Sequence, residues 1–307
     1  MTEPVAVDQA MAAGQPAVLA EISEGNLRRD AWLLLRGKPE FLISATLILV
    51  LLFIAAFPGL VASLFGHGDP RVCDLASSGL GPRAGHPFGF DLQGCDLYAN
   101  VIYGARPSIS IGLLATSTSF VVSAVLGILA GYHGGFVDAA VSRLMDVFFG
   151  FPFILGGIII LTAFPHRTVW TIAFVLALFS WPTGTRLMRS SALALRDADY
   201  VLAARALGAS SPRVMIRHVF PNAVAPLLVL STLAVGGIIA AEASLTFLGV
   251  GLRLPAISWG LQLSVAQGYL RQYPHMLFFP ALFLSLTVLA FILLGDALRD
   301  AFDPKLR

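Results

Sequence analysis

The sequence predicts an all-α protein that crosses a membrane six times. Of its 307 residues, 57% are hydrophobic and only 12% are charged, whereas soluble domains carry about 25% charged residues. Several uncharged runs reach the roughly 18 residues that cross a bilayer core of ~30 Å. The net charge of +2 is small and the arginines lie in loops, so nucleic-acid binding is not expected.

The chain before the first predicted span has two parts. Residues 1–25 lack the basic start and apolar centre of a signal peptide and are expected to be a disordered cytoplasmic tail. Residues 26–40 surround a tryptophan with basic residues: Arg28, Arg29, Arg36 and Lys38 around Trp32. This pattern is typical of a helix lying at the inner membrane surface, although a simple flanking anchor is an equal alternative. The first span follows over residues 41–66, and its helix is expected to end near Pro58.

The segment of residues 67–106 is polar, rich in Gly and Pro, and too long for a tight turn, so a small ordered lobe is expected. It contains Cys73 and Cys95, the only two cysteines of the chain. If the lobe lies outside the cell, a disulfide between them is chemically permitted. Two unpaired thiols are the alternative.

The core of residues 107–297 is expected to hold the other five spans, at 107–132, 147–164, 168–185, 219–248 and 276–295. Gly127 and Gly131 have the spacing that lets helices approach closely in lipid. An outer loop of residues 253–274 carries aromatic residues of the kind that lie at lipid headgroups: Trp259, Tyr269 and Tyr273. Residues 298–307 are expected to form a charged cytoplasmic tail.

Basic residues predict the orientation of the six spans. Of the 20 arginines and lysines, 14 fall on the side that carries both termini and residues 197–221. The cytoplasmic side of a membrane protein carries the excess of Lys and Arg. Both termini are therefore expected in the cytoplasm, and the cysteine-containing lobe outside.

Several kinds of chemistry are disfavoured. The only lysines, Lys38 and Lys305, do not follow a GxxxxG pattern, so the chain has no phosphate-binding loop for ATP. The six histidines fall at span ends or in loops, with no metal-ligand spacing and no nucleophile–base arrangement. A metal site and an enzyme activity are therefore not expected. A secondary carrier would normally show more ionisable groups inside its spans.

Glu242 is the one acid clearly inside an apolar run. If its helix begins near residue 223, Glu242 lies about 28 Å along it, near the outer surface of the bilayer. It is interpreted either as an interfacial carboxylate in water or capping a neighbouring helix, or as an outer gate of a translocation path that faces a partner subunit.

Residues 197–221 predict a water-facing helical hairpin between two spans. Good helix formers run to Leu207, and Gly208 follows as a helix-ending residue. Ser211 is the expected N-cap of a second helix, with Pro212 at its first position and Pro221 at its end. Such a hairpin is suited to contact with another protein.

Within this hairpin, LAARALGASSPRVMIRHVFP resembles the EAA signature of ABC importer permeases. Four residues fall on the signature with its spacing: Ala203, Ala204, Gly208 and Pro221. Three others depart from it: Leu202 replaces Glu, His218 replaces Ile and Phe220 replaces Leu. Tyr200 and the sequence pattern YVxAARxLGAS match the variant of this signature found in peptide permeases.

Three further stretches agree with that family: HPFGFDLQGCDLYANVIYGAR at 86–106, EASLTFLGVGLRLPAISWG at 242–260, and LGDALRDAFDPKLR at 294–307. The chain is therefore similar to the C-type membrane subunit of dipeptide and oligopeptide (and nickel) ABC importers. Cys95 stands where the family usually has Arg, which favours a disulfide with Cys73 particular to this lineage. Ile292 stands where Asn is usual, so no role is transferred to it.

The resemblance implies a type I ABC importer permease with a MetI-like fold, in a bacterial inner membrane. A homologous B-type permease, ATPase subunits that bind ATP and Mg, and an extracytoplasmic peptide-binding protein are the implied partners; this chain holds no cofactor. The implied ATPase-coupling residues are Tyr200, Ala203, Ala204, Arg205, Gly208, Arg213 and Pro221. Nickel, glutathione or another small solute is the alternative cargo, and a stand-alone secondary transporter or channel is the alternative outside this class.

Overall fold

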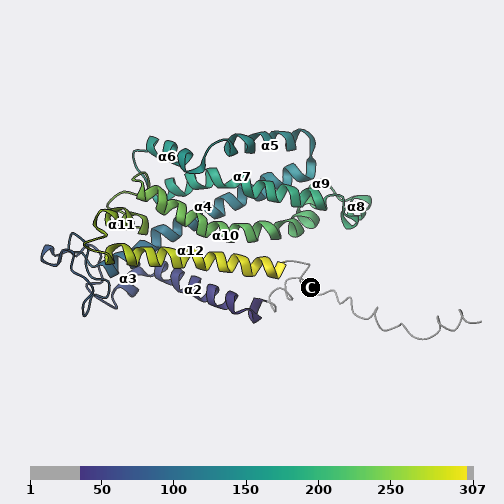
Figure 1. The fold of residues 1–307 in the computed structure, drawn as a ribbon. Coiled ribbons are helices and arrows are strands. Elements are labelled where there is room, and N and C mark those ends of the chain that lie inside the picture. The colour runs from purple at the N-terminus through teal and green to yellow at the C-terminus, as the bar shows by residue number, and fades with distance from the viewer. Residues whose placement is uncertain (1–34, 303–307) are drawn as a thin grey trace, which may run out of the picture.

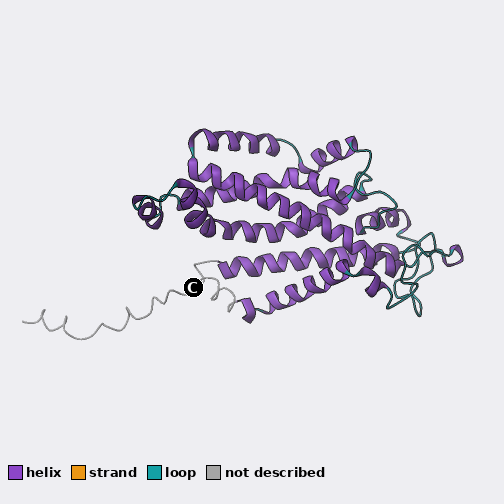
Figure 2. Cartoon of the chain, turned by 180° about the vertical axis from the view of Figure 1, so that it is seen from behind, coloured by secondary structure: helices purple, strands orange, loops and turns teal. Residues whose placement is uncertain are grey.

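The computed structural model describes residues 35–302. Within these residues the chain forms helices and connecting loops, and strand pairing is limited to isolated bridges. Long helices lie alongside one another in an elongated bundle, with a loop-rich lobe at one end and the short helix α8 at the other (Figures 1 and 2). The expected tail of residues 1–25 and most of the expected interfacial helix lie outside the described residues, as do residues 303–307.

Five long helices build the bundle: α2 (Pro39–Ala56), α4 (Leu97–His133), α7 (Val169–Leu195), α10 (Phe220–Phe247) and α12 (His275–Phe302). Within the described residues, six shorter helices complete it: α3 (Pro58–Ala62), α5 (Gly135–Phe149), α6 (Phe153–Ala163), α8 (Asp199–Ala206), α9 (Ser211–Val214) and α11 (Trp259–Ala266). Single 3₁₀ or π turns occur at η1 (Leu75–Ser77), η2 (Met215–Val219) and η3 (Gln267–Tyr269).

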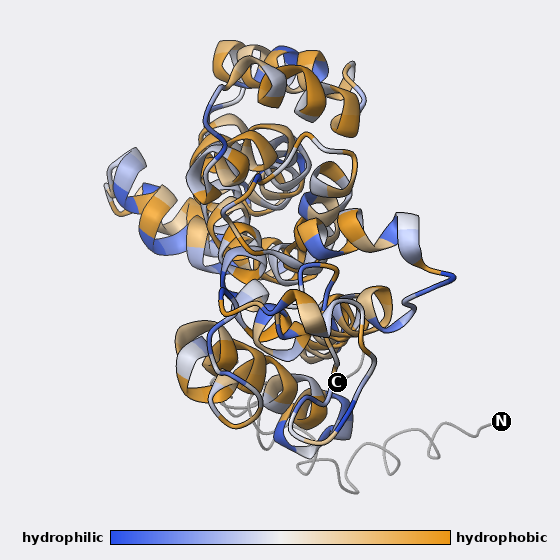
Figure 3. Cartoon of the chain, turned by 90° about the vertical axis from the view of Figure 1, so that its left-hand side faces the viewer, coloured by the Kyte–Doolittle hydropathy of each residue, from blue (hydrophilic) through white to orange (hydrophobic). Residues whose placement is uncertain are grey.

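Four helices of the described chain are long and apolar enough to cross a membrane: α2, α4, α12 and the continuous helix Ser211–Phe247. A fifth span results if α5 and α6 are taken together. The predicted count of six is therefore not reproduced by length and composition, because α7 fails this test. Hydrophobic residues nevertheless cover most of the helices, and hydrophilic ones are frequent in the connecting loops (Figure 3).

The structure differs from two of the predicted spans, one in continuity and one in its starting residue. The predicted third span, 147–164, is not one helix, because α5 ends at Phe149 and α6 begins at Phe153 with a bend of 85°. Pro152 explains this break, since a proline disfavours helical geometry at the residue before it. The predicted second span began at Pro107, but α4 begins ten positions earlier and contains that proline. Asp96 caps the earlier start by accepting a hydrogen bond from the amide of Tyr98.

The last helix extends past its predicted end near residue 295 and reaches Phe302. It therefore includes all of the described part of the expected C-terminal tail. Lys38, just before α2, donates to Asp300 in α12 at 2.7 Å. Leu35 also packs against Ala297 and Ala301. The beginning of α2 and the end of α12 thus lie side by side at the end of the bundle opposite the lobe (Figure 1).

The close approach predicted for Gly127 and Gly131 is confirmed. A Cβ atom on Gly127 would lie 2.6 Å from the Cβ of Met188 in α7, and one on Gly131 would lie 2.5 Å from the carbonyl oxygen of Arg189. Real side chains do not tolerate such distances, so these two glycines let α4 and α7 pack backbone against backbone.

The loop of residues 253–274 contains helix α11, which the sequence did not predict. Trp259 begins this helix and is completely buried rather than placed at headgroups. Its indole N–H donates to the carbonyl oxygen of Val101 in α4 at 2.9 Å. The tryptophan can therefore be buried because a backbone carbonyl accepts the hydrogen bond of its one polar atom.

Candidate functional site

The hairpin of residues 197–221 protrudes at the end of the bundle opposite the lobe, where α8 is labelled in Figure 1. Helix α8 ends at Ala206, and Gly208 follows with φ of +83°. This left-handed conformation favours glycine, and the helix ends as the sequence predicts.

The second half of the hairpin differs from the prediction. Ser210, rather than Ser211, precedes helix α9 and occupies the cap position. The π turn η2 then leads into α10 without a break, and Pro221 lies in the first turn of α10 instead of ending a helix. The wider π turn, in which the amide of Phe220 donates to the carbonyl of Met215, lets the helix continue past a residue that lacks an N–H.

Three valines anchor the base of the hairpin: Val201, Val214 and Val219 are fully buried. They belong to one apolar cluster with Tyr132 at the end of α4 and Met188 in α7. Because α4 and α7 share the most extensive contact of any helix pair in the described residues, the base of the hairpin is anchored to a well-packed part of the bundle.

The tip of the hairpin is exposed and largely apolar. Leu207 is 89% exposed, and Leu202, which stands in place of the signature Glu, is 47% exposed. Among the predicted coupling residues, Ala204 is half-buried. The others are exposed: Tyr200, Ala203, Arg205, Gly208, Arg213 and Pro221. The guanidinium of Arg205 lies 5.1 Å from the centre of the Tyr132 ring, where a cation–π contact holds it.

A pocket between α4, α6, α7 and α10, called here the hydroxyl-bearing pocket, was not predicted. Its volume is about 270 Å³, and its lining is mostly apolar. Six of the lining residues carry hydroxyls: Thr116, Ser119, Ser123, Ser180, Thr183 and Ser231. The first three are spaced at i, i+3 and i+7, which places them on one face of α4. That spacing was a signal available in the sequence.

Glu242 lies inside the subunit, with no exposed surface. Its Oε1 accepts a hydrogen bond of 2.8 Å from Thr246, and the hydroxyls of Ser108 and Ser258 are its other polar neighbours. The expected exposure to water, or to a partner subunit, is therefore wrong. Counting residues gives the depth of a side chain along a helix, but not which way it points.

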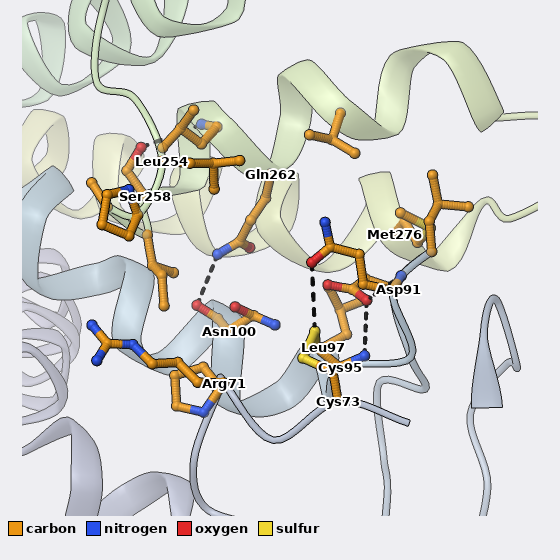
Figure 4. A pocket seen from close by; sticks show the side chains of 18 residues that line it. Arg71, Cys73, Asp91, Cys95, Leu97, Asn100, Leu254, Ser258, Gln262 and Met276 are labelled. Carbon is orange, nitrogen blue, oxygen red and sulfur yellow. Dashed lines mark hydrogen bonds between the residues drawn. A yellow bond between two sulfur atoms is a disulfide. The ribbon is translucent and has the colours of Figure 1, made fainter. Parts of the chain in front are cut away.

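The lobe contains a disulfide between Cys73 and Cys95. Beside it, a pocket of about 460 Å³ opens between the lobe and α11, and Figure 4 shows its lining. The side chain of Gln262 crosses this pocket and donates to the carbonyl of Asn100 at 2.8 Å. This pocket lies at the opposite end of the molecule from the hairpin.

Asp91 lies on the wall of the same pocket and holds the turn before Cys95. Its Oδ1 accepts hydrogen bonds from the amides of Gln93 at 2.8 Å and Cys95 at 2.9 Å. Burial raises the pKa of this carboxyl above the ordinary value of 3.8, although these backbone donors oppose the shift.

Comparison with known proteins gives a consistent result. Residues 123–307 match the family described as "Binding-protein-dependent transport system inner membrane component". The dipeptide transport system permease protein DppC of Alkalihalophilus pseudofirmus is 34% identical over 91% of this chain and 90% of its own length. The oligopeptide permease OppC of Bacillus subtilis is 34% identical over 92% and 91%. The glutathione permease GsiD of Pectobacterium atrosepticum is 35% identical over 86% and 87%.

The family match covers the exposed hairpin and the buried Glu242, and the relatives extend over nearly the whole chain. Apolar helices that can cross a membrane accompany this similarity. The chain therefore belongs to the family of binding-protein-dependent transport system inner membrane components.

Proposed function

We propose that this chain is the C-type permease subunit of an ATP-driven peptide importer, and that its hairpin docks on a separate ATPase. The observation that carries the proposal is Leu207, which is 89% exposed on a hairpin whose base is fully buried. An exposed apolar tip on an anchored base is suited to bind in an apolar groove of a partner and to transmit its motion. The chain has no ATP-binding loop, so in this proposal the separate ATPase supplies the energy.

The proposed arrangement places the hairpin and both termini in the cytoplasm. The excess of arginine and lysine on that side supports it, and so does a disulfide at the opposite end, because disulfides persist outside the cytosol. An extracytoplasmic binding protein would deliver the substrate to the lobe end. A homologous B-type permease would supply the other half of the translocation path.

The hydroxyl-bearing pocket offers a polar cargo several hydrogen-bonding partners within an otherwise apolar lining. Serine and threonine side chains can replace water around the amides of a peptide without placing a charge inside the membrane. We infer that this pocket is where the path touches the subunit. Peptides are the first candidate because the relatives include dipeptide and oligopeptide permeases, and glutathione is the second because GsiD is equally similar.

A substitution at Gly208 tests the coupling role. A Cβ atom there would meet nothing within 4 Å, so only the φ of +83° resists a side chain. Gly208→Val should strain the hairpin by about 1–2 kcal/mol or unwind its turn. Gly208→Asn is the matched control, because asparagine adopts this conformation more readily.

The measurement is uptake of a labelled dipeptide into liposomes that contain the complete importer and internal ATP. We expect uptake to fall about tenfold or more in Gly208→Val and to remain near normal in Gly208→Asn. Equal uptake by both variants would contradict the coupling role. Uptake that needs no ATPase and is insensitive to vanadate would instead indicate a stand-alone carrier.

A further inference from the structure

Three potential metal ligands meet in the lobe: His67, His86 and Asp96. One ligand atom from each lies within 4.8 Å of the other two. Nδ1 of His86 is 2.9 Å from Oδ2 of Asp96, and the two imidazole rings have centres 5.1 Å apart. Spacing along the sequence conceals this group, because His67 and Asp96 are 29 positions apart.

The fold holds Asp96 rigidly in this group. Its side chain is fully buried, and Oδ1 accepts a hydrogen bond of 2.9 Å from the amide of Tyr98 at the start of α4. That bond leaves Oδ2 directed toward the histidines. A carboxylate whose orientation is already fixed loses little freedom when it binds an ion.

The loop after α3 brings His67 to the same oxygen. Gly66 and Gly68 flank it with φ of +65° and +71°, and the amide of His67 lies 3.4 Å from Oδ2 of Asp96. A Cβ atom on Gly66 would collide with that oxygen. Glycine at this position therefore permits the close approach that places a second histidine beside Asp96.

The chemistry of the three ligands selects the kind of ion. Two imidazoles and one carboxylate form a set that suits zinc, nickel or cobalt, whereas calcium and magnesium prefer oxygen ligands alone. Bonds of ~2.0–2.1 Å in a tetrahedron place ligand atoms roughly 3.4 Å apart. The atoms here are at most 4.8 Å apart, and His67 is the exposed member that can move inward.

We propose that His67, His86 and Asp96 bind one divalent transition-metal ion of the zinc, nickel and cobalt class at the outer lobe. The fourth position of the ion is left for water or a passing ligand. Bound there, the ion joins the loop after α3 to the first turn of α4. This site lies outside the hairpin and the hydroxyl-bearing pocket, so it does not depend on the cargo proposed above.

The test uses the full chain, purified without a polyhistidine tag and freed of metal with a chelator. Titration calorimetry with zinc and then nickel should show one saturable site per chain. His67→Ala should weaken that site by about tenfold or more. The matched control is His166→Ala, an exposed histidine between α6 and α7, which should leave the affinity unchanged.

The proposal fails if the wild-type chain shows no saturable site, or if His67→Ala binds as tightly as the wild type. A separate measurement distinguishes two sources of the ion. Metal that copurifies with the untreated protein and survives dialysis indicates a resident ion. A saturable site that is empty after purification, and whose ion exchanges freely, indicates a solute captured at the outer end. Either result supports the proposal that His67, His86 and Asp96 are the ligands.

Discussion

The hydroxyl of Thr246 donates a 2.8 Å hydrogen bond to Oε1 of Glu242 and accepts one of 3.3 Å from the amide of Leu252. Glu242 and Leu252 lie on either side of the turn that ends α10, and both side chains are buried. One hydroxyl thus pairs with both a buried carboxylate oxygen and a backbone amide at the C-terminal end of this helix.

Thr246→Val should therefore destabilise the protein by about 1–3 kcal/mol for each buried group left unpaired. Unfolding temperature in detergent measures the effect. Thr232→Val is the control, because Thr232 lies in the same helix and bonds only the carbonyl of Leu228 at an exposed position. If the unfolding temperature falls equally in the two variants, the buried hydrogen bonds of Thr246 contribute no more to stability than the exposed one of Thr232.

A second prediction concerns the ion pair between Asp138 in α5 and Arg189 in α7. The guanidinium donates two hydrogen bonds to the carboxylate, one of them 2.6 Å from Nη2 to Oδ2. Both side chains are mostly shielded from water. Asp138→Asn should cost about 1.5–3 kcal/mol and should increase hydrogen exchange in residues 135–149.

The control for that prediction is the exposed pair Arg143–Asp146, whose charged atoms are 3.7 Å apart. Asp146→Asn should change stability by no more than about 1 kcal/mol, because water and salt screen such pairs. A larger effect at Asp146 than at Asp138 would contradict the assignment of Arg189 as the residue that holds α5 against the bundle.

The parts of the fold that could be predicted from the sequence are those governed by local chemistry. Long apolar runs predicted α2, α10 and α12, because a helix must be long and hydrophobic enough to cross a bilayer. The turn at Gly208 was predictable because a positive φ favours glycine. In contrast, α11 is short and uncharged, and its buried tryptophan depends on contacts with α4, α10 and α12, which are distant in the sequence.

The rest of the candidate site depends on contacts between distant residues. The direction of the Glu242 side chain depends on how α10 packs on α4 and α11. Counting residues along the helix does not give that packing. The group of His67, His86 and Asp96 exists only after the lobe folds. Hydropathy also predicted the third span as one helix, because it reflects the length of an apolar run. It does not reveal the break between α5 and α6 before Pro152.

A third prediction concerns Cys73 and Cys95, which are 22 positions apart. Mass spectrometry without reductant should find them cross-linked, and reduction should destabilise the lobe by about 2–4 kcal/mol. Hydrogen exchange should then rise in residues 73–95 while α4 and α7 stay protected, since the bridge lies outside their interface. Two thiols that alkylate in the native, unreduced protein would rule out the bridge.

The last prediction is a dependence of lobe stability on pH. Burial raises the pKa of Asp91 above its ordinary value of 3.8, so the folded lobe binds a proton more tightly than the unfolded one. Between the two pKa values the folded state carries more protons, and its stability therefore falls as pH rises through that window. Hydrogen exchange of residues 73–95, corrected for intrinsic rates, should show more protection at the acidic end.

Asp91→Asn isolates this effect. The amide oxygen can still accept the hydrogen bonds that the backbone of Gln93 and Cys95 donates to Asp91, but the side chain no longer ionises. The pH dependence assigned to Asp91 should disappear, and protection at neutral pH should equal or exceed that of the wild type, because no buried charge remains. If protection instead rises with pH in the wild type, the backbone hydrogen bonds outweigh burial, and the pKa of Asp91 is lowered rather than raised.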